Sequence, residues 1–210
     1  MKINNIEVNF ISGDITKLVV DAYIIPQFFC QASTAGVGGA VMRSGALEGI
    51  EAYQKYIDKN GNLNFGEGII TKSGGGNSNF LLHVASVDSG KENEFQTIQK
   101  AIYTALYLAN QQKLSTIATP ALGTLSAEQS AKAIFSAIDQ FSKTANGIEN
   151  ISLVFFNDPT AIETSKNILL NDLYHVQAEE GAKTVDYNKV HEELLENGVK
   201  NVAFFNLMES

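Results

Sequence analysis

The sequence is poor in cysteine, and it has no long apolar run. Its single cysteine, Cys30, has no partner for an intramolecular disulfide, which suits a reducing compartment. No apolar segment approaches the roughly 20 residues that a membrane-spanning helix needs. The first ten residues, MKINNIEVNF, show neither the apolar region nor the small-residue cleavage site of a signal peptide. We therefore expect a cytoplasmic protein with no membrane partner.

Basic residues are also in short supply. The 15 lysines and arginines are outnumbered by 23 aspartates and glutamates, which gives a net charge of −8 and a pI of about 4.9. A field of this sign repels phosphate, so nucleic acid and anionic lipid are disfavoured as partners. A small phosphate-bearing ligand is still compatible with this charge, because backbone N–H groups bind anions without a positive side chain.

The chain has enough apolar residues to bury a core. Of its 210 residues 44% are hydrophobic and 18% charged, a composition typical of a globular domain. Apolar patterning predicts strands at residues 6–11, 18–25, 66–71, 80–84, 115–119 and 151–156. It predicts helices after the glycine-rich stretch 31–46 and at residues 94–112, 126–143 and 158–170. This alternation favours an α/β fold with helices on both faces of a sheet.

Individual residues mark the ends of these elements. We expect the second strand to end at Pro26, Ser126 to cap one helix and Pro159 to lie in the first turn of another. The glycine-rich stretch should open a helix with Val41, Leu47, Ile50 and Tyr53 at helical spacing, and residues 73–79 read as a hairpin loop.

The last part of the chain breaks the alternation. Residues 179–184 read as a linker, 186–197 as a short charged helix and 201–207 as a strand. We therefore divide the chain into a domain at 1–174 and an extension at 175–210 that packs on the domain or on a second copy of the chain.

Three loops rich in small residues follow predicted strands. They are SGDIT (12–16), ASTAGVGGAV (32–41) and PALGTLSA (120–127). Ligands of open α/β sheets bind outside the carboxyl ends of the strands, and small residues let the backbone approach a ligand closely. Glycines in a single loop are explained by turns alone, but three such loops together favour a ligand site.

The order of segments resembles the macrodomain family. GDIT, VDA, GVGGAV, GEGIIT, the strand FLLHV with His83, PALGT and LVFFNDPTAIET follow one another collinearly over roughly residues 5–172. The resemblance implies a three-layer α/β/α fold with a mixed central sheet. It also implies binding of ADP-ribose and its derivatives, and some members of the family remove ADP-ribose from proteins or hydrolyse O-acetyl-ADP-ribose.

The resemblance implies a role for each loop. Asp14 would accept a hydrogen bond from the adenine amino group beside the Ile15 N–H, or it would simply cap its turn. Phe156 would pack on adenine with Asn157 beside it, or it would belong to the core. Backbone amides of the two glycine loops would face the diphosphate. The implied ligand-binding residues are Asp14, Ile15, Gly36, Val37, Gly38, Gly39, Ala40, Val41, Gly123, Thr124, Leu125, Ser126, Phe156 and Asn157.

The sequence departs from the hydrolase branch of the family. Two asparagine positions after VDA are Ile25 and Phe28 here, and an aspartate position in the first glycine loop is Gly38. None of these three can orient a ribose hydroxyl or an attacking water. The second loop is also shorter, because LSAEQS leads almost directly into a helix. The adenine and diphosphate end is therefore retained, whereas the catalytic end is lost and no catalytic residue is assigned.

We predict structural roles for the other potentially reactive residues. We expect His83 to be a hydrogen-bonded structural histidine and Cys30 to be a buried, inert thiol. His175 and His191 have no metal-ligand companions at useful spacing. We expect neither a metal nor a cofactor.

Three functional hypotheses remain. The first, which we favour, is a module that binds ADP-ribose or a related adenine nucleotide, free or on an ADP-ribosylated protein. The second is an ADP-ribosyl or O-acetyl-ADP-ribose hydrolase that uses another group, such as Asp88 or His83. The third is a scaffold that makes a protein contact, or a homo-oligomer, through residues 175–210.

Overall fold

Seven strands form one mixed sheet in the computed structural model of the chain, which describes all residues except 88–89, 91–93, 145, 176–184 and 197–210. The strands are β1 (Lys2–Ile3), β2 (Ile6–Ser12), β3 (Val20–Phe28), β4 (Gly68–Lys72), β5 (Ser78–Val87), β6 (Thr116–Pro120) and β7 (Asn150–Phe155). Their order is β1-β2-β7-β6-β3-β5-β4. The five inner strands run parallel, and the edge strands β1 and β4 are antiparallel to their neighbours.

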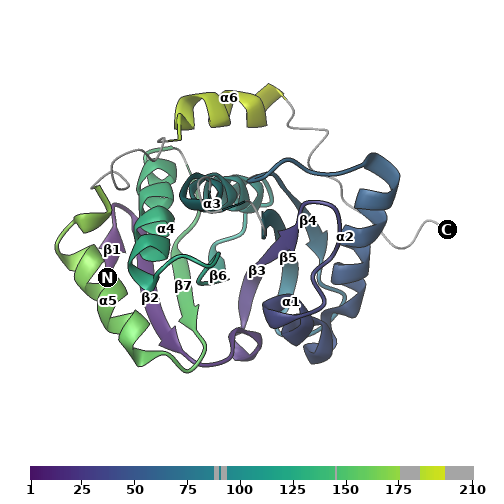
Figure 1. Cartoon of the computed structure of the whole chain (residues 1–210), viewed down its shortest axis with the longest axis horizontal. Helices are drawn as coiled ribbons and strands as arrows, with labels where there is room; N and C mark the ends of the chain where they lie inside the picture. Colours follow the sequence, from purple (N-terminus) through teal and green to yellow (C-terminus); the bar gives the residue numbers. More distant parts are fainter. Residues whose placement is uncertain (88–89, 91–93, 145, 176–184, 197–210) are drawn as a thin grey trace.

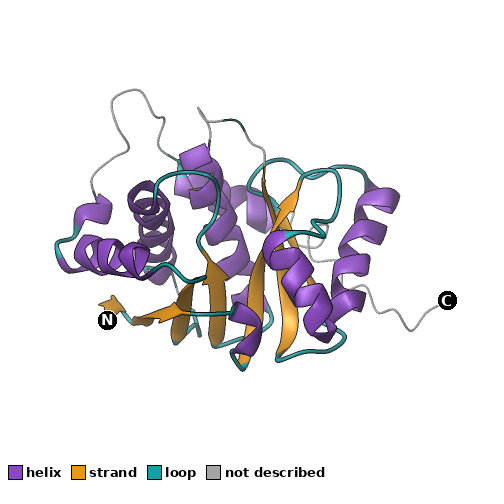
Figure 2. Ribbon diagram, turned by 60° about the horizontal axis from the view of Figure 1, so that its bottom comes forward, coloured by secondary structure: helices purple, strands orange, loops and turns teal. Residues whose placement is uncertain are grey.

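Alternate residues of β3 divide the core between two faces of the sheet. Ala22 and Ile24 pack with α3 (Glu94–Gln111), α4 (Ala127–Ser142) and α5 (Pro159–Leu170). Tyr23 and Ile25 pack on the opposite face with α1 (Gly36–Val41) and α2 (Leu47–Asn60). The sheet therefore lies between two helical layers (Figures 1 and 2). The predicted three-layer α/β/α architecture is confirmed.

The helix after the first glycine loop is broken by Gly45. A π-helical segment, η2 (Met42–Ala46), follows α1, and Gly45 has a φ of 115° within it. This conformation favours glycine, and it turns α2 away from the axis of α1. Leu47 therefore lies on the outside, 46% exposed, whereas Ile50 and Tyr53 of the same predicted apolar series are buried. Val41 is fully buried.

The strand β3 runs past the position where it was expected to end. Pro26 lies within the strand and pairs with Val84 of β5. Pairing of β3 with β6 covers only Ala22 and Tyr23, so on that edge the missing N–H of Pro26 interrupts no ladder. Proline inside the strand is tolerated for this reason.

Helix starts were predicted more accurately. Ser126 is the N-cap of α4 and accepts a hydrogen bond from the N–H of Gln129. Asp158 caps α5 in the same way through Ala161, with Pro159 in the first turn. Residues 73–77 connect the antiparallel strands β4 and β5, which confirms the predicted hairpin.

The end of the described chain returns to the domain. After η3 (Leu173–His175), α6 (Tyr187–Glu196) lies against α3, and its Val190 and Leu194 join the main core. The linker and strand expected at 179–184 and 201–207 lie outside the described residues, so the division at residue 174 stays a prediction. Within the described part, no helix combines the length and apolarity needed to cross a membrane.

Candidate functional site

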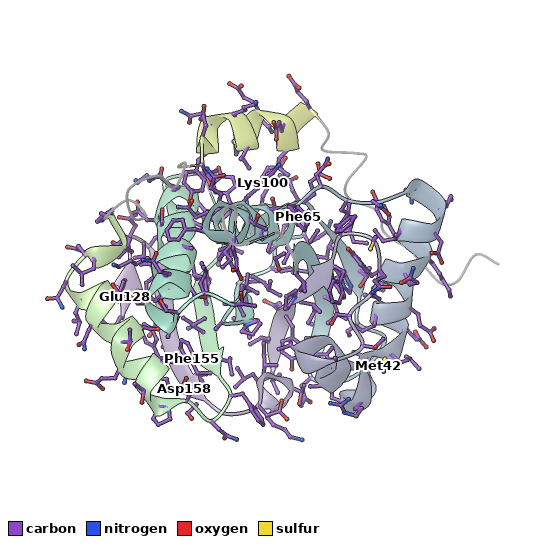
Figure 3. The ribbon with its side chains drawn as sticks, in the orientation of Figure 1. Met42, Phe65, Lys100, Glu128, Phe155 and Asp158 are labelled. Atoms are coloured by element: carbon purple, nitrogen blue, oxygen red, sulfur yellow. The ribbon has the colours of Figure 1, made fainter. Side chains whose placement is uncertain are left out.

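Four segments at the carboxyl ends of the strands surround a pocket of about 610 Å³. This size lies within the range of roughly 300–1,000 Å³ that is usual for small-ligand sites. Figure 3 shows Phe155 and Asp158 on one side of the region and Met42 on the other. The pocket is lined by Gly13, Asp14, Ile15, Gly36, Val37, Ala40, Arg43, Pro120, Ala121, Val154, Phe155, Phe156 and Asp158.

Two smaller hollows lie beside α6, away from this pocket. Their volumes are about 320 Å³ and 270 Å³, and they share Lys100, Val190 and Glu193 in their walls. Figure 3 places Lys100 and Phe65 at the end of the molecule opposite Phe155 and Asp158. The described helix of the extension therefore does not cover the main pocket.

Asp14 begins the first wall of the pocket and also caps a turn. Its Oδ1 accepts hydrogen bonds from the N–H of Thr16 at 2.9 Å and from the Thr16 hydroxyl at 2.8 Å, which fixes the 3-10 turn η1 (Ile15–Lys17). The two bonds lower the pKa of the carboxyl, with a smaller contribution from Lys17. Among the described residues only Oδ1 is engaged, so capping leaves Oδ2 available to a ligand.

The first glycine loop places only part of its backbone on the pocket. Gly36, Val37 and Ala40 line the wall, whereas the predicted residues Gly38, Gly39 and Val41 are buried behind it. A Cβ on Gly38 would lie 2.2 Å from the carbonyl oxygen of Ser33, and one on Gly39 would lie 2.3 Å from that of Thr34. These two glycines are therefore required by the packing of the loop on residues 33–34.

The loop after β7 contributes an exposed aromatic ring. Phe156 lines the pocket and is 74% exposed, so the alternative that it belongs to the core is wrong. Its neighbour Phe155 is buried, and Asp158 lines the pocket while capping α5. Asn157 is exposed with a φ of 57° and does not line the pocket.

The second glycine loop faces away from the pocket over most of its length. Pro120 and Ala121 line the pocket, but residues 123–126, which the sequence assigned to the ligand, do not. Both the N–H and the hydroxyl of Thr124 donate hydrogen bonds to the buried carboxylate of Glu94 on α3. The contact of this loop with the diphosphate stays a prediction, and Glu94 is a structural partner that local sequence gave no reason to expect.

Comparison with known proteins places this geometry in a family. A model of the Macro domain matches residues 32–134. An O-acetyl-ADP-ribose deacetylase of Escherichia fergusonii is 30% identical over 119 residues, which cover 56% of this chain and 67% of that protein. The chain belongs to the macrodomain family. Its resemblance to that family, read from the order of its loops, is thereby confirmed.

Other relatives differ in length from this macrodomain. A protein of Sulfolobus acidocaldarius is 32% identical over 121 residues, covering 58% of this chain and 66% of the relative. One of Thermotoga maritima is 28% identical over 120 residues, covering 56% of this chain and 20% of the relative. The match therefore spans less than two thirds of these two proteins.

Solved structures support the fold. The Oceanobacillus iheyensis macrodomain with ADP aligns with a TM-score of 0.74 at 22% identity, covering 84% of this chain and 96% of that chain. The Trypanosoma brucei macrodomain in complex with ADP-ribose aligns with a TM-score of 0.65 at 16% identity, covering 78% and 69%.

The positions where this macrodomain departs from the hydrolase branch are packed into its interior. Ile25 is fully buried in the apolar cluster with Tyr23, Val41 and Ile50, and it does not reach the pocket. Phe28 is partly buried, and its carbonyl accepts a hydrogen bond from the Tyr53 hydroxyl at 2.7 Å. Neither side chain offers a polar group to a ligand.

His83 has the structural role that the sequence predicted. It is fully buried, and its two ring nitrogens lie 2.9 Å from Nε2 of Gln27 and 2.9 Å from Oγ1 of Thr71. Burial lowers the pKa of His83 to about 3, against a weaker effect of the Gly49 backbone, so the ring is neutral at physiological pH. A buried neutral ring with both nitrogens engaged does not serve as a general base for a ligand in the pocket.

Cys30 and His191 lie outside the pocket. Cys30 is only partly buried, so the prediction of a buried thiol is wrong. His191 packs on Tyr103, whose hydroxyl lies 3.0 Å from Nδ1 of the ring. Asp88 is outside the described residues. Within those residues, no group of three or more His, Cys, Asp or Glu side chains could hold a metal ion.

Arg43 is one of the pocket residues that the sequence reasoning missed, and the others are Gly13, Pro120, Ala121, Val154, Phe155 and Asp158. Arg43 is the single arginine of the chain, and it lines the pocket seven residues after Gly36. Its helical spacing from Gly36 and Ala40 was a usable signal, because positions i, i+4 and i+7 share one face of a helix.

Proposed function

We propose that this macrodomain binds ADP-ribose, or a related adenine nucleotide, and does not hydrolyse it or its conjugates efficiently. The observation that carries the proposal is the convergence of Asp14, Gly36 and Phe156 on one pocket at the carboxyl ends of the sheet. The solved macrodomains of O. iheyensis with ADP and of T. brucei with ADP-ribose support the same ligand class.

The adenine end is assigned to Asp14, Ile15 and Phe156. Oδ2 of Asp14 accepts a hydrogen bond from the exocyclic amino group while Oδ1 keeps its bonds to Thr16. The backbone N–H of Ile15 is the neighbouring donor. The exposed ring of Phe156 stacks on the base, which hides apolar area that the free protein leaves in water.

The diphosphate is assigned to the backbone at the start of α1. The N–H of Gly39 is bonded to the carbonyl of Ala35, so the N–H groups of Gly36 and Val37 precede the bonded part of the helix. Donors of this kind bind phosphate oxygens without a cationic side chain, which suits a protein with a net charge of −8.

Among the described residues, the positions assigned to the distal ribose offer no group for hydrolysis. Ile25 is buried in an apolar cluster, and Gly38 has no side chain and no room for one. No carboxylate or amide from these positions is therefore available to orient a water, and the macrodomain is assigned to binding of the nucleotide, free or on an ADP-ribosylated protein.

Isothermal titration calorimetry with ADP-ribose, ADP and AMP tests the proposal. We expect micromolar binding with ADP-ribose preferred. Absence of heat with all three nucleotides, for protein shown to be folded, would contradict the proposal.

A second candidate is hydrolysis of O-acetyl-ADP-ribose or of ADP-ribosylated protein by unconventional groups. The observation in its favour is the 30% identity to a protein described as an O-acetyl-ADP-ribose deacetylase. Time-dependent release of ADP-ribose from a mono-ADP-ribosylated protein would establish it. No release at an enzyme concentration equal to that of the substrate would exclude it.

A further inference from the structure

Arg43 is the one cationic side chain in the described lining of the pocket. The other charged residues of the lining are Asp14 and Asp158, both of which cap a turn or helix. No carboxylate of the described residues lies within 4.0 Å of Arg43, and the described hydrogen bonds do not include it. A guanidinium that faces a pocket without an internal counterion has its five donors available to a ligand.

The guanidinium of Arg43 lies beside Gly39. Its Nη1 is 3.1 Å from the point that a Cβ of Gly39 would occupy. The side chain therefore folds back over the preceding turn, because long helical side chains lean toward the N-terminus of their helix, and Arg43 lines the same pocket as Gly36 and Val37. Its charge is brought to the wall that the proposed function assigns to the diphosphate.

The charge of the pocket gives this position a role. Asp14 and Asp158 repel an anionic ligand, and the chain as a whole carries a net charge of −8. Asp14 is needed for the base in the proposed function, so a favourable charge has to come from elsewhere in the wall. Arg43 is the described side chain that can supply it.

We propose that Arg43 binds a phosphate group of the nucleotide and makes the pocket select diphosphate ligands over unphosphorylated adenosine. This inference rests on the proposed function and extends it from the backbone to a side chain. A guanidinium forms two parallel hydrogen bonds to phosphate oxygens, which an ammonium cannot do. Arg43 is thus a specificity-determining residue with no part in any bond cleavage.

The test compares Arg43→Gln and Arg43→Lys with the parent protein by calorimetry, using ADP-ribose as titrant and adenosine in a competition format. Lys55→Gln is the matched control, because it removes the same charge from an exposed position on α2 outside the pocket lining. Thermal unfolding of each variant shows whether it is folded. We expect the Arg43 variants to fold, because the side chain of Arg43 is exposed.

We expect Arg43→Gln to lower the affinity for ADP-ribose about tenfold or more, which is the usual loss for a hydrogen-bonded charge. The affinity for adenosine should fall less than about twofold. The affinity of Arg43→Lys for ADP-ribose should lie between those of Arg43→Gln and the parent, and the affinity of Lys55→Gln should equal that of the parent. The parent's affinity for ADP-ribose should also fall more steeply with NaCl than that of Arg43→Gln, because salt screens exposed charges.

The outcomes separate the two proposals. If the parent binds ADP-ribose and Arg43→Gln binds it equally well, the role of Arg43 is overturned and the proposed function stands. Equal weakening of ADP-ribose and adenosine would also overturn phosphate selection. If the folded parent binds no nucleotide, both the proposed function and the role of Arg43 fall.

Discussion

Gln27 donates a hydrogen bond from Nε2 to Nδ1 of His83 over 2.9 Å, deep in the sheet. The direction follows from the rest of the network. Oε1 of Gln27 accepts the N–H of Ser33, so the amide presents its NH₂ to the imidazole. Nδ1 is then the acceptor, and Nε2 carries the proton and donates to Oγ1 of Thr71. The loop at Ser33 is thereby tied to β3, β5 and β4.

The neutral form of His83 should make stability depend on pH. Its pKa is about 3 in the folded protein because of burial, against roughly 6.5 in an unfolded chain. The unfolded state therefore binds a proton first as pH falls, and the free energy of unfolding decreases below about pH 6.5. Between pH 7.5 and 5.0 we expect His83 to account for a loss of about 2 kcal/mol, measured by urea denaturation.

His83→Asn provides the control for this pH dependence. The variant should be less stable than the parent at pH 7.5, because Gln27 and Thr71 lose a buried hydrogen-bond partner. Its stability should not show the decrease between pH 7.5 and 5.0 that we attribute to His83. Parallel stability profiles of the two proteins between pH 7.5 and 5.0 would show that His83 does not cause the effect.

Asp21 should stabilise the junction of β3 and β6. Its Oδ2 accepts hydrogen bonds from the N–H and hydroxyl groups of Ser115 and Thr116, at 2.9 to 3.2 Å. Burial raises the pKa of this carboxyl, but the four bonds outweigh burial and hold the pKa below its usual value. We expect Asp21→Asn to lower the free energy of unfolding by about 1–3 kcal/mol at pH 7.

The pH dependence expected for Asp21 has a different cause from that of His83. Hydrogen bonds lower the pKa of Asp21, whereas burial lowers the pKa of His83. Because the folded pKa of Asp21 is depressed, its contribution is present above the unfolded value of about 4 and is lost as pH falls through the folded value. The midpoint of urea denaturation measures it. Glu51→Gln, an exposed change of the same charge on α2, should leave the midpoint unchanged; an equal shift in both variants would point to net charge instead.

Restoring an aspartate at Gly38 should not restore hydrolysis. A Cβ at this position would lie 2.2 Å from the carbonyl oxygen of Ser33, so the loop has to move to accept any side chain. We expect Gly38→Asp to lower stability by about 1–3 kcal/mol, measured by thermal denaturation, with no release of ADP-ribose from a modified protein.

Gly147→Ala is the control for Gly38→Asp, since nothing lies within 4 Å of its added Cβ. It should unfold at the temperature of the parent. A stable and hydrolytically active Gly38→Asp protein would show that the loop adapts readily and would contradict this prediction.

Asp14→Asn separates the two roles of Asp14. Asparagine caps a turn as well as aspartate does, so the hydrogen bond from Thr16 should persist and stability should change little. An amide with its oxygen held by Thr16 turns its NH₂ toward the ligand, where the adenine amino group needs an acceptor. We expect ADP-ribose to bind about 5- to 150-fold more weakly in calorimetry, and unchanged affinity would remove Asp14 from the adenine site.

The elements of this macrodomain were predictable where the signal is local. The helix at 94–111 was placed to within one residue of its end, because its apolar residues repeat at helical spacing over many turns. The Ser126 and Asp158 starts follow from side chains that bond backbone two or three residues away. The helix predicted after the first glycine loop is present, but Gly45 interrupts it at a positive φ, which the repeat of apolar residues does not reveal.

The sequence by itself determined the order of strands and helices, the family and the loops that meet at the pocket, because these depend on periodicity, capping and motifs along the chain. Tertiary structure alone decided which atoms of those loops face a ligand. Thr124 bonds to Glu94, 30 residues away, and Gly38 packs on the carbonyl of Ser33 instead of lining the pocket. Arg43 lies over Gly39 in the pocket wall. The contact of Thr124 with Glu94 depends on how separate elements approach in space, and spacing along the chain does not encode that approach.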